Sequence, residues 1–143
     1  MSNLDIALNR LQGILTHFDA QEGILRLCVQ LCDGSKNMES QMLNALLLED
    51  STFLESFLQK TLELGFKESS VIVGLELKGL HNTFKSKILD IQQDELFARL
   101  ALEVQDKAIT ALCPLDFIRQ NALKKGDYVK WHIPENAVMI YAN

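Results

Sequence analysis

The chain has 143 residues, of which 48% are hydrophobic and 23% charged, and it contains only two prolines and seven glycines. This composition excludes disordered, collagen-like and low-complexity proteins, and the length suffices for one well-formed core. Fourteen lysines and arginines against nineteen aspartates and glutamates give a net charge of −5, which argues against tight DNA binding because phosphate neutralisation supplies most of the affinity of DNA-binding proteins.

Residues 1–69 are predicted to form a small acidic helical bundle of unknown role. Residues 1–75 carry ten acidic and five basic side chains, so this part of the chain holds the whole negative excess. Its first apolar side chains recur at spacings of four and three, the pattern of an amphipathic helix: Leu4, Leu8, Leu11, Leu15 and Phe18. One face of this helix is expected to pack against the rest of the bundle.

Three further helices are predicted in the same part of the chain. Residues 24–32 follow a break and predict a second, more buried helix, and residues 38–48 predict a third. Thr52 and Glu55 have the spacing of a capping box and predict the start of a fourth helix, which ends at Gly65.

From residue 71 the apolar period changes to strict alternation, which predicts strands. Further strand candidates, rich in β-branched and aromatic residues, follow at 84–91, 95–104, 107–113, 128–133 and 137–141. A short helix is predicted within 114–122 and a turn at 124–127. The predicted fold class is therefore α+β, a helical domain at 1–69 followed by an OB-like barrel at 70–143, with no internal repeat visible.

The second domain resembles the Mop or TOBE family over residues 78–140. Five stretches carry the resemblance: Asn82 ahead of 84–88, then 96–104, 108–111, 123–129 and 137–140. The resemblance implies a β-barrel that binds molybdate or tungstate in molybdate-responsive regulators, transporter ATPases and storage proteins. It also implies a homo-oligomer, a dimer or larger, with anion sites between subunits. An exposed barrel edge independently favours such association.

Most positions that bind the oxyanion in this family are replaced here. Aligning the family's Ser-Ala-Arg-Asn motif on Asn82 places Gly79 at the serine and His81 at the arginine, and the remaining hydroxyl and lysine positions fall on Pro114, Phe117 and Pro134. A tetrahedral dianion needs several hydrogen-bond donors to offset its desolvation. Two explanations stay open: the barrel has kept its shape and lost the ligand, or the anion is bound by His81, Asn82, Lys78 and Lys85.

No pattern of residues indicates catalysis, and the chain is not expected to be an enzyme. The sequence has no G-x-S-x-G, no phosphate-binding glycine loop and no H-E-x-x-H. Cys28 and Cys32 would share a helix face, but a zinc site needs more ligands, so these are expected to be buried thiols, with no metal and no certain cofactor. The few cysteines, the absence of an export signal and the short apolar runs predict a cytoplasmic protein without membrane insertion.

The leading functional hypothesis is an oxyanion-binding, regulatory or accessory protein of molybdenum transport, with a degenerate anion site and with a molybdate transporter or regulator as its partner. The alternative is a structural oligomerisation or protein-interaction module with no small ligand. A further alternative is a DNA-binding, molybdate-responsive regulator. Nucleic acid is not the expected partner, because the helix predicted at 38–48 has no cationic side chain to present to a groove.

Overall fold

The computed structural model describes residues 7–31, 41–48 and 55–141. Short 3-10 segments lie at η2 (Glu68–Ser70) and η3 (Glu135–Ala137), and one α-helix, α1 (Leu115–Gln120), lies in the described chain. The strands are β1 (Leu8–Gln21), β2 (Ile24–Leu31), β3 (Met42–Leu47), β4 (Thr61–Lys67), β5 (Ile72–Gly74), β6 (Thr83–Gln93), β7 (Phe97–Val104), β8 (Lys107–Pro114), β9 (Tyr128–His132) and β10 (Met139–Tyr141).

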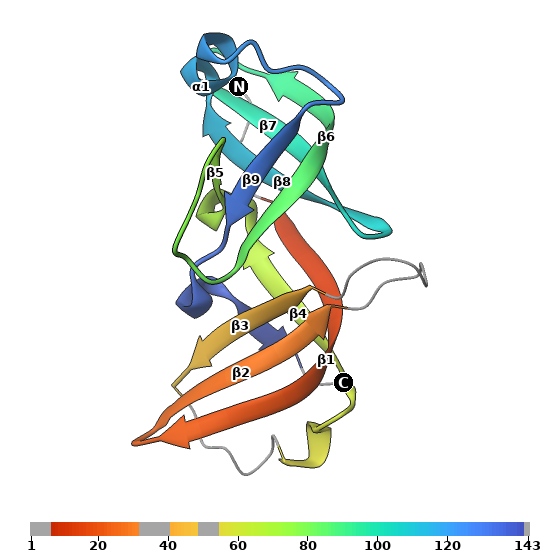
Figure 1. Ribbon diagram of the computed structural model, residues 1–143, viewed down its shortest axis with the longest axis vertical. Helices are drawn as coiled ribbons and strands as arrows, with labels where there is room; N and C mark the ends of the chain where they lie inside the picture. Colours follow the sequence, from red (N-terminus) through yellow and green to blue (C-terminus); the bar gives the residue numbers. More distant parts are fainter. Residues whose placement is uncertain (1–6, 32–40, 49–54, 142–143) are drawn as a thin grey trace.

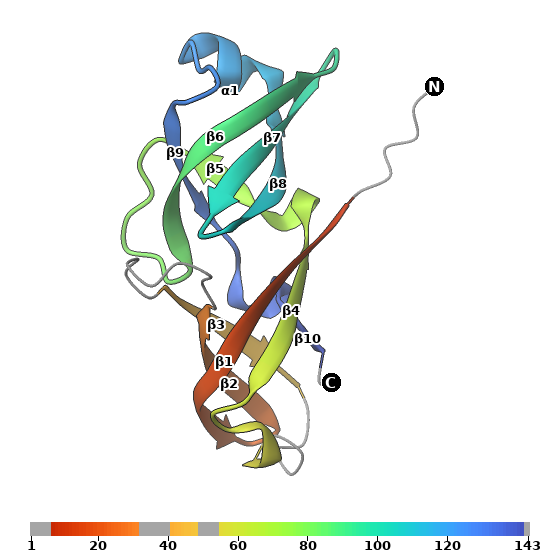
Figure 2. The same cartoon turned by 90° about the vertical axis from the view of Figure 1, so that its right-hand side faces the viewer.

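The strands form two antiparallel, OB-like sheets that are stacked end to end along the long axis of the molecule (Figures 1 and 2). The order is β10-β4-β1-β2-β3 in the lower sheet of Figure 1 and β5-β9-β6-β7-β8 in the upper sheet. We call β1–β4 the first half and β6–β9 the second half. Helix α1 lies at the outer end of the second half (Figure 1).

The two sheets repeat one topology, although no repeat is visible in the sequence. Each first strand has a β-bulge at the same place, between Leu15 and His17 in β1 and between Ile88 and Asp90 in β6. β5 follows β4 in the chain but pairs with β9, whereas β10 follows β9 but pairs with β4. The two halves therefore exchange their fifth strands.

The expected helical bundle at 1–69 is wrong, because the described part of this segment is β-structure. β1 buries alternate residues Leu11, Gly13 and Leu15, and the bulge after Leu15 then shifts the register so that Phe18 packs against the core. Core-facing residues of a strand normally recur every two residues, but across the bulge the large apolar ones, Leu11, Leu15 and Phe18, are separated by four and then three residues. These are the spacings of an amphipathic helix, so the fold class is β rather than α+β.

The other predicted helices are wrong for local reasons. β2 buries Leu25, Leu27, Val29 and Leu31 in strict alternation, and counting Cys28 as apolar conceals this period. β3 occupies 42–47 of the third predicted helix. The fourth is limited to a 3-10 turn at 55–57 before β4, and Gly65 lies inside β4. Thr52 of the predicted capping box lies outside the described residues.

The strands predicted after residue 82 are confirmed. β6, β7, β8 and β9 cover the expected segments, and α1 forms within 114–122. The turn at 124–127 is closed by Asp127, whose carboxylate accepts the Lys124 backbone N–H at 3.0 Å. The predicted strand from residue 71 is reduced to β5, and the last one to β10.

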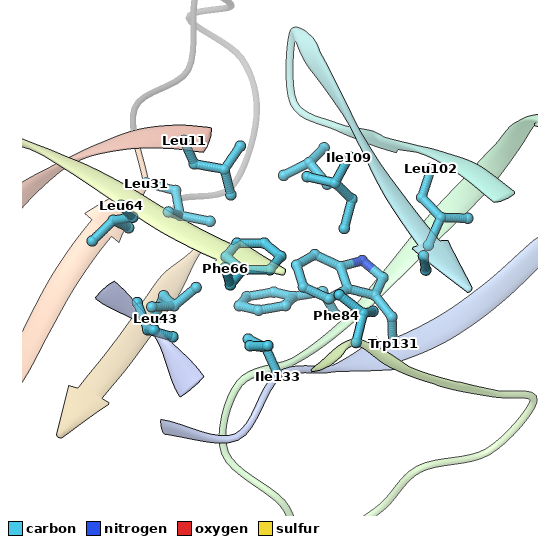
Figure 3. Packing of buried hydrophobic residues seen from close by; sticks show 14 of the residues in the cluster. Leu11, Leu31, Leu43, Leu64, Phe66, Phe84, Leu102, Ile109, Trp131 and Ile133 are labelled. Atoms are coloured by element: carbon cyan, nitrogen blue, oxygen red, sulfur yellow. The ribbon is translucent and has the colours of Figure 1, made fainter. Parts of the chain in front are cut away.

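A continuous aromatic and aliphatic core joins the two halves (Figure 3). Trp131 of β9 is fully buried, with its ring centroid 6.0 Å from that of Phe66 in β4 and 4.7 Å from that of Phe84 in β6. Its indole N–H donates to the Ser86 hydroxyl at 3.0 Å, so the one polar atom of the ring is satisfied. The halves therefore share one core.

Candidate functional site

Asn82, which the resemblance aligns with the asparagine of the anion motif, uses its side chain inside the protein. It is buried and has a positive φ of 59°. Its amide oxygen accepts the Asn44 backbone N–H at 2.7 Å, and its amide nitrogen donates to the carbonyls of Asn44 at 2.8 Å and Ile133 at 3.0 Å. Both N–H groups of the amide are therefore occupied by the fold, so they are not free for a ligand in this chain.

Asn9 makes the corresponding contacts in the other direction. Its amide nitrogen donates to the Thr110 carbonyl at 2.8 Å, and its oxygen accepts the Thr110 backbone N–H at 2.8 Å. We call Asn9 and Asn82 the latch asparagines. Each one lies at the start of the long first strand of one half and binds an edge strand of the other half, β8 or β3. The backbone groups of Thr110 and Asn44, near the middle of these edge strands, are therefore already hydrogen-bonded within the chain.

Two arginine–glutamate pairs, like the two latch asparagines, each connect one half of the protein to the other. Arg99 donates to the two carboxylate oxygens of Glu68 at 2.8 and 3.0 Å, and the Glu68 side chain is fully buried. Arg26 donates to Glu135 at 2.9 and 3.2 Å in a more exposed setting, and this hydrogen bond raises the pKa of its guanidinium. Bidentate pairs of this kind fix geometry. Both arginines are therefore engaged in joining η2 or η3 to the opposite half.

The four predicted anion ligands are not gathered into one pocket. Lys78 and His81 are exposed in the segment between β5 and β6, whereas Asn82 is buried. Lys85 is exposed on β6, with its ammonium nitrogen 5.4 Å from the centroid of the Tyr128 ring. No hydrogen bond or ion pair between any two of these four is found in the described chain.

The residues at the replaced family positions have roles in the fold. Gly79 has a φ of 75°, a conformation that glycine adopts without strain. Pro114 ends β8 and is the N-cap of α1, with a φ of −62°, and Pro134 has the same role before η3, with a φ of −58°. Phe117 lies half-buried in α1 and packs against the core. At the positions that the resemblance aligns with anion donors, this chain therefore has residues with backbone or packing roles.

Two surface hollows lie on the first half, and neither has the chemistry of an oxyanion site. The larger, of about 560 Å³, lies between β3 and β10 and is lined by Leu46, Leu47, Leu48, Asn136, Val138, Met139 and Ile140. The smaller, of about 350 Å³, contains Asp19 and Glu22, and its one cation, Arg26, is bound to Glu135. The larger hollow offers a dianion almost no hydrogen-bond donors, and the acidic side chains of the smaller one repel it.

No group of three metal-ligating side chains is found among the residues that the structure describes. Cys28 lies half-buried in β2 rather than on a helix, and Cys32 lies outside those residues. Cys113 is buried, and desolvation raises the pKa of its thiol to about 11. Such a thiol is a poor nucleophile and a poor metal ligand at neutral pH.

No family model matches this sequence, and no curated protein matches it. One solved structure, of the cytoplasmic molybdate-binding protein ModG with molybdate bound, is similar in fold with a TM-score of 0.81. The likeness covers 94% of this chain and 96% of that one, at 18% sequence identity. The chain therefore shares the fold of ModG over nearly its whole length. No helix in the described ranges is long and apolar enough to cross a bilayer.

Proposed function

We propose that this protein binds a tetrahedral oxyanion of the molybdate or tungstate class and acts in molybdenum transport or its regulation, by binding rather than by catalysis. The carrying observation is the fold likeness to a molybdate-binding protein across both halves, including the first half, where the sequence resemblance does not reach. The cytoplasmic location of ModG supports the same location for this chain.

The proposed ligands are basic side chains that are exposed at the start of β6 and in the segment before it. Lys78, His81 and Lys85 are accessible there, whereas Asn82 acts as a latch and contributes no free N–H. Three exposed side chains are a weak cage for a dianion in water, because an anion gains most from donors held in a desolvated setting. We therefore propose that the sites are completed between the subunits of a homo-oligomer, and that a molybdate transporter or regulator is its partner.

Isothermal titration calorimetry with molybdate, tungstate and sulfate tests this function. We expect heat and a finite stoichiometry with molybdate or tungstate, and weaker binding of sulfate. Size-exclusion chromatography of the same samples gives the subunit number. The absence of heat with all three anions at millimolar concentration, together with no retention in equilibrium dialysis, would reject the proposal.

The alternative is an interaction module with no small ligand, and the apolar hollow between β3 and β10 favours it. Leu46 and Leu48 at its edge are exposed, Leu48 by 82%, and exposed apolar clusters mark protein contacts. A self-associating protein with no anion binding would favour this alternative. The DNA-binding alternative gains no support, because the helix predicted at 38–48, already without a cationic side chain, is replaced by β3.

A further inference from the structure

A row of cationic side chains crosses the outward face of the second half. Phe84, Ser86, Val129 and Trp131 point into the core, so the intervening residues of β6 and β9 point outward. Lys85 lies directly opposite Lys130, with Thr83 opposite His132 on one side and Lys87 opposite Tyr128 on the other. We call Lys85, Lys87, Lys130 and His132 the cationic ladder.

The ladder brings its charges within reach of one small ion. Directly opposed residues have Cβ atoms about 5 Å apart, and outward neighbours along one strand are about 7 Å apart. Lysine side chains are long enough to converge over such distances. No ion pair of the three ladder lysines is found in the described chain, so the ladder concentrates positive charge on a protein of net charge −5.

This arrangement works against the stability of the sheet. Like charges directly opposite each other destabilise a strand pair. Glu103 of β7 lies beside Lys87 when the register of β6 and β7 is extended by one residue, but Lys85 and Lys130 make no ion pair. A dianion bound between these two ammonium groups would remove the repulsion.

The first half shows that the fold does not require the ladder. Its corresponding strands, β1 and β4, have Gln12 opposite Glu63 where the second half has Lys85 opposite Lys130. Glu63 is in turn neutralised by Arg10 at 2.6 Å. The position of Lys87 is apolar there, and Gly65 takes the position of His132. The same backbone thus carries a neutral face in one half and a cationic face in the other.

One atom of the ladder also lacks a partner. The Nδ1 atom of His132 is buried and makes no hydrogen bond to any described residue. Buried polar atoms are almost always hydrogen-bonded, and no described residue supplies a partner to this one. A water molecule that also binds the oxyanion can fill this role.

We infer that the cationic ladder is a binding site for a tetrahedral oxyanion dianion, held chiefly between Lys85 and Lys130 with Lys87 and His132 beside it. This inference rests on the proposed function and moves its site from the segment before β6 to the outward face of β6 and β9, so that of the ligands proposed above only Lys85 is kept. The ligand class is the one shared by molybdate, tungstate, sulfate and hydrogen phosphate. The two lysines supply charge-assisted donors, which are the stronger kind of hydrogen bond.

The test compares two double variants of equal charge change. Lys85→Gln with Lys130→Gln removes the centre of the ladder, and Lys60→Gln with Lys67→Gln removes two exposed lysines of the first half. Calorimetry with molybdate is expected to give an affinity about tenfold or more weaker for the ladder variant and within about twofold of wild type for the control. Circular dichroism and thermal melts establish that both variants fold. Without anion, the ladder variant is expected to melt no lower than wild type, because a repulsion has been removed.

The outcomes separate the two proposals. Equal molybdate affinity in wild type and ladder variant overturns the ladder as the site while the proposed function stands. Binding of sulfate or phosphate but not of molybdate, lost in the ladder variant, keeps the ladder and rejects the molybdate function. If wild type binds none of the four anions in calorimetry or dialysis, both proposals are rejected.

Discussion

Replacing the latch residue Asn82 by alanine is expected to cost about 4 kcal/mol of folding free energy. The substitution removes three hydrogen bonds, two to Asn44 and one to Ile133, each worth about 1 kcal/mol net. Asn82 also has a φ of 59°, and alanine pays about 1 kcal/mol or more in this left-handed region, which asparagine tolerates better. The sum is a large share of the roughly 5–15 kcal/mol that stabilises a typical protein.

Guanidinium unfolding followed by tryptophan fluorescence measures this loss. Trp131 is the one tryptophan of the chain and lies fully buried between the halves, so its emission reports the shared core. Asn9→Ala is the matched control, because it removes the equivalent latch at a residue without a positive φ. We expect it to cost about 1 kcal/mol less than Asn82→Ala. Asn82→Gly is expected to recover the conformational part alone.

A loss below about 1 kcal/mol for Asn82→Ala would refute the latch, because unsatisfied buried groups alone should cost more than that. Unchanged stability combined with lost molybdate binding would instead return Asn82 to the ligand set. The unfolding slope must stay constant across the variants for this comparison, since a changed slope indicates a changed unfolded or native state.

Three further predictions concern other contacts. Glu68→Gln is expected to cost about 3 kcal/mol in the same unfolding assay, because it removes the buried carboxylate that pairs with the partly buried Arg99 guanidinium. The more exposed Glu135→Gln should cost about 1 kcal/mol or less, and equal losses would contradict this ranking. Gly65→Ala is expected to cost about 1–3 kcal/mol, because the new Cβ would lie 2.8 Å from the Tyr141 ring, and a double-mutant cycle with Tyr141→Ala should show favourable coupling. Cys113, with its thiol pKa raised to about 11 by burial, is expected to resist alkylation at pH 8 in the folded protein and to react after denaturation, as read by mass spectrometry; rapid labelling of the folded chain would contradict its burial.

The second half could be predicted from sequence because its strands are marked locally. Alternation from Thr83 onward and the turn at 124–127 need no information from elsewhere in the chain. In the first half, the bulge after Leu15 produces helical spacing in a strand. The strand exchange is not readable at all, because β5 and β10 have the same local pattern whichever sheet they join. Pairing partners are a long-range property.

The site shows the same division. Asn82 is identified from sequence, but its role as a latch depends on Asn44, which lies 38 residues away in the chain. Asn9 is missed, although it lies at the start of β1 and Asn82 lies directly before β6. Lys130 is also missed, and the alternation of β6 and β9 would have placed it on the face of Lys85 if the two strands had been paired.

The strand exchange has a consequence for how this protein can diversify. Two separate, identical half-length chains could build the same ten-strand body by swapping strands, but every change would then appear twice. In a single chain the two halves can have different residues at equivalent positions. The second half has Lys85 opposite Lys130 where the first half has Gln12 opposite Glu63. One chain can therefore present two different surfaces on the same repeated topology.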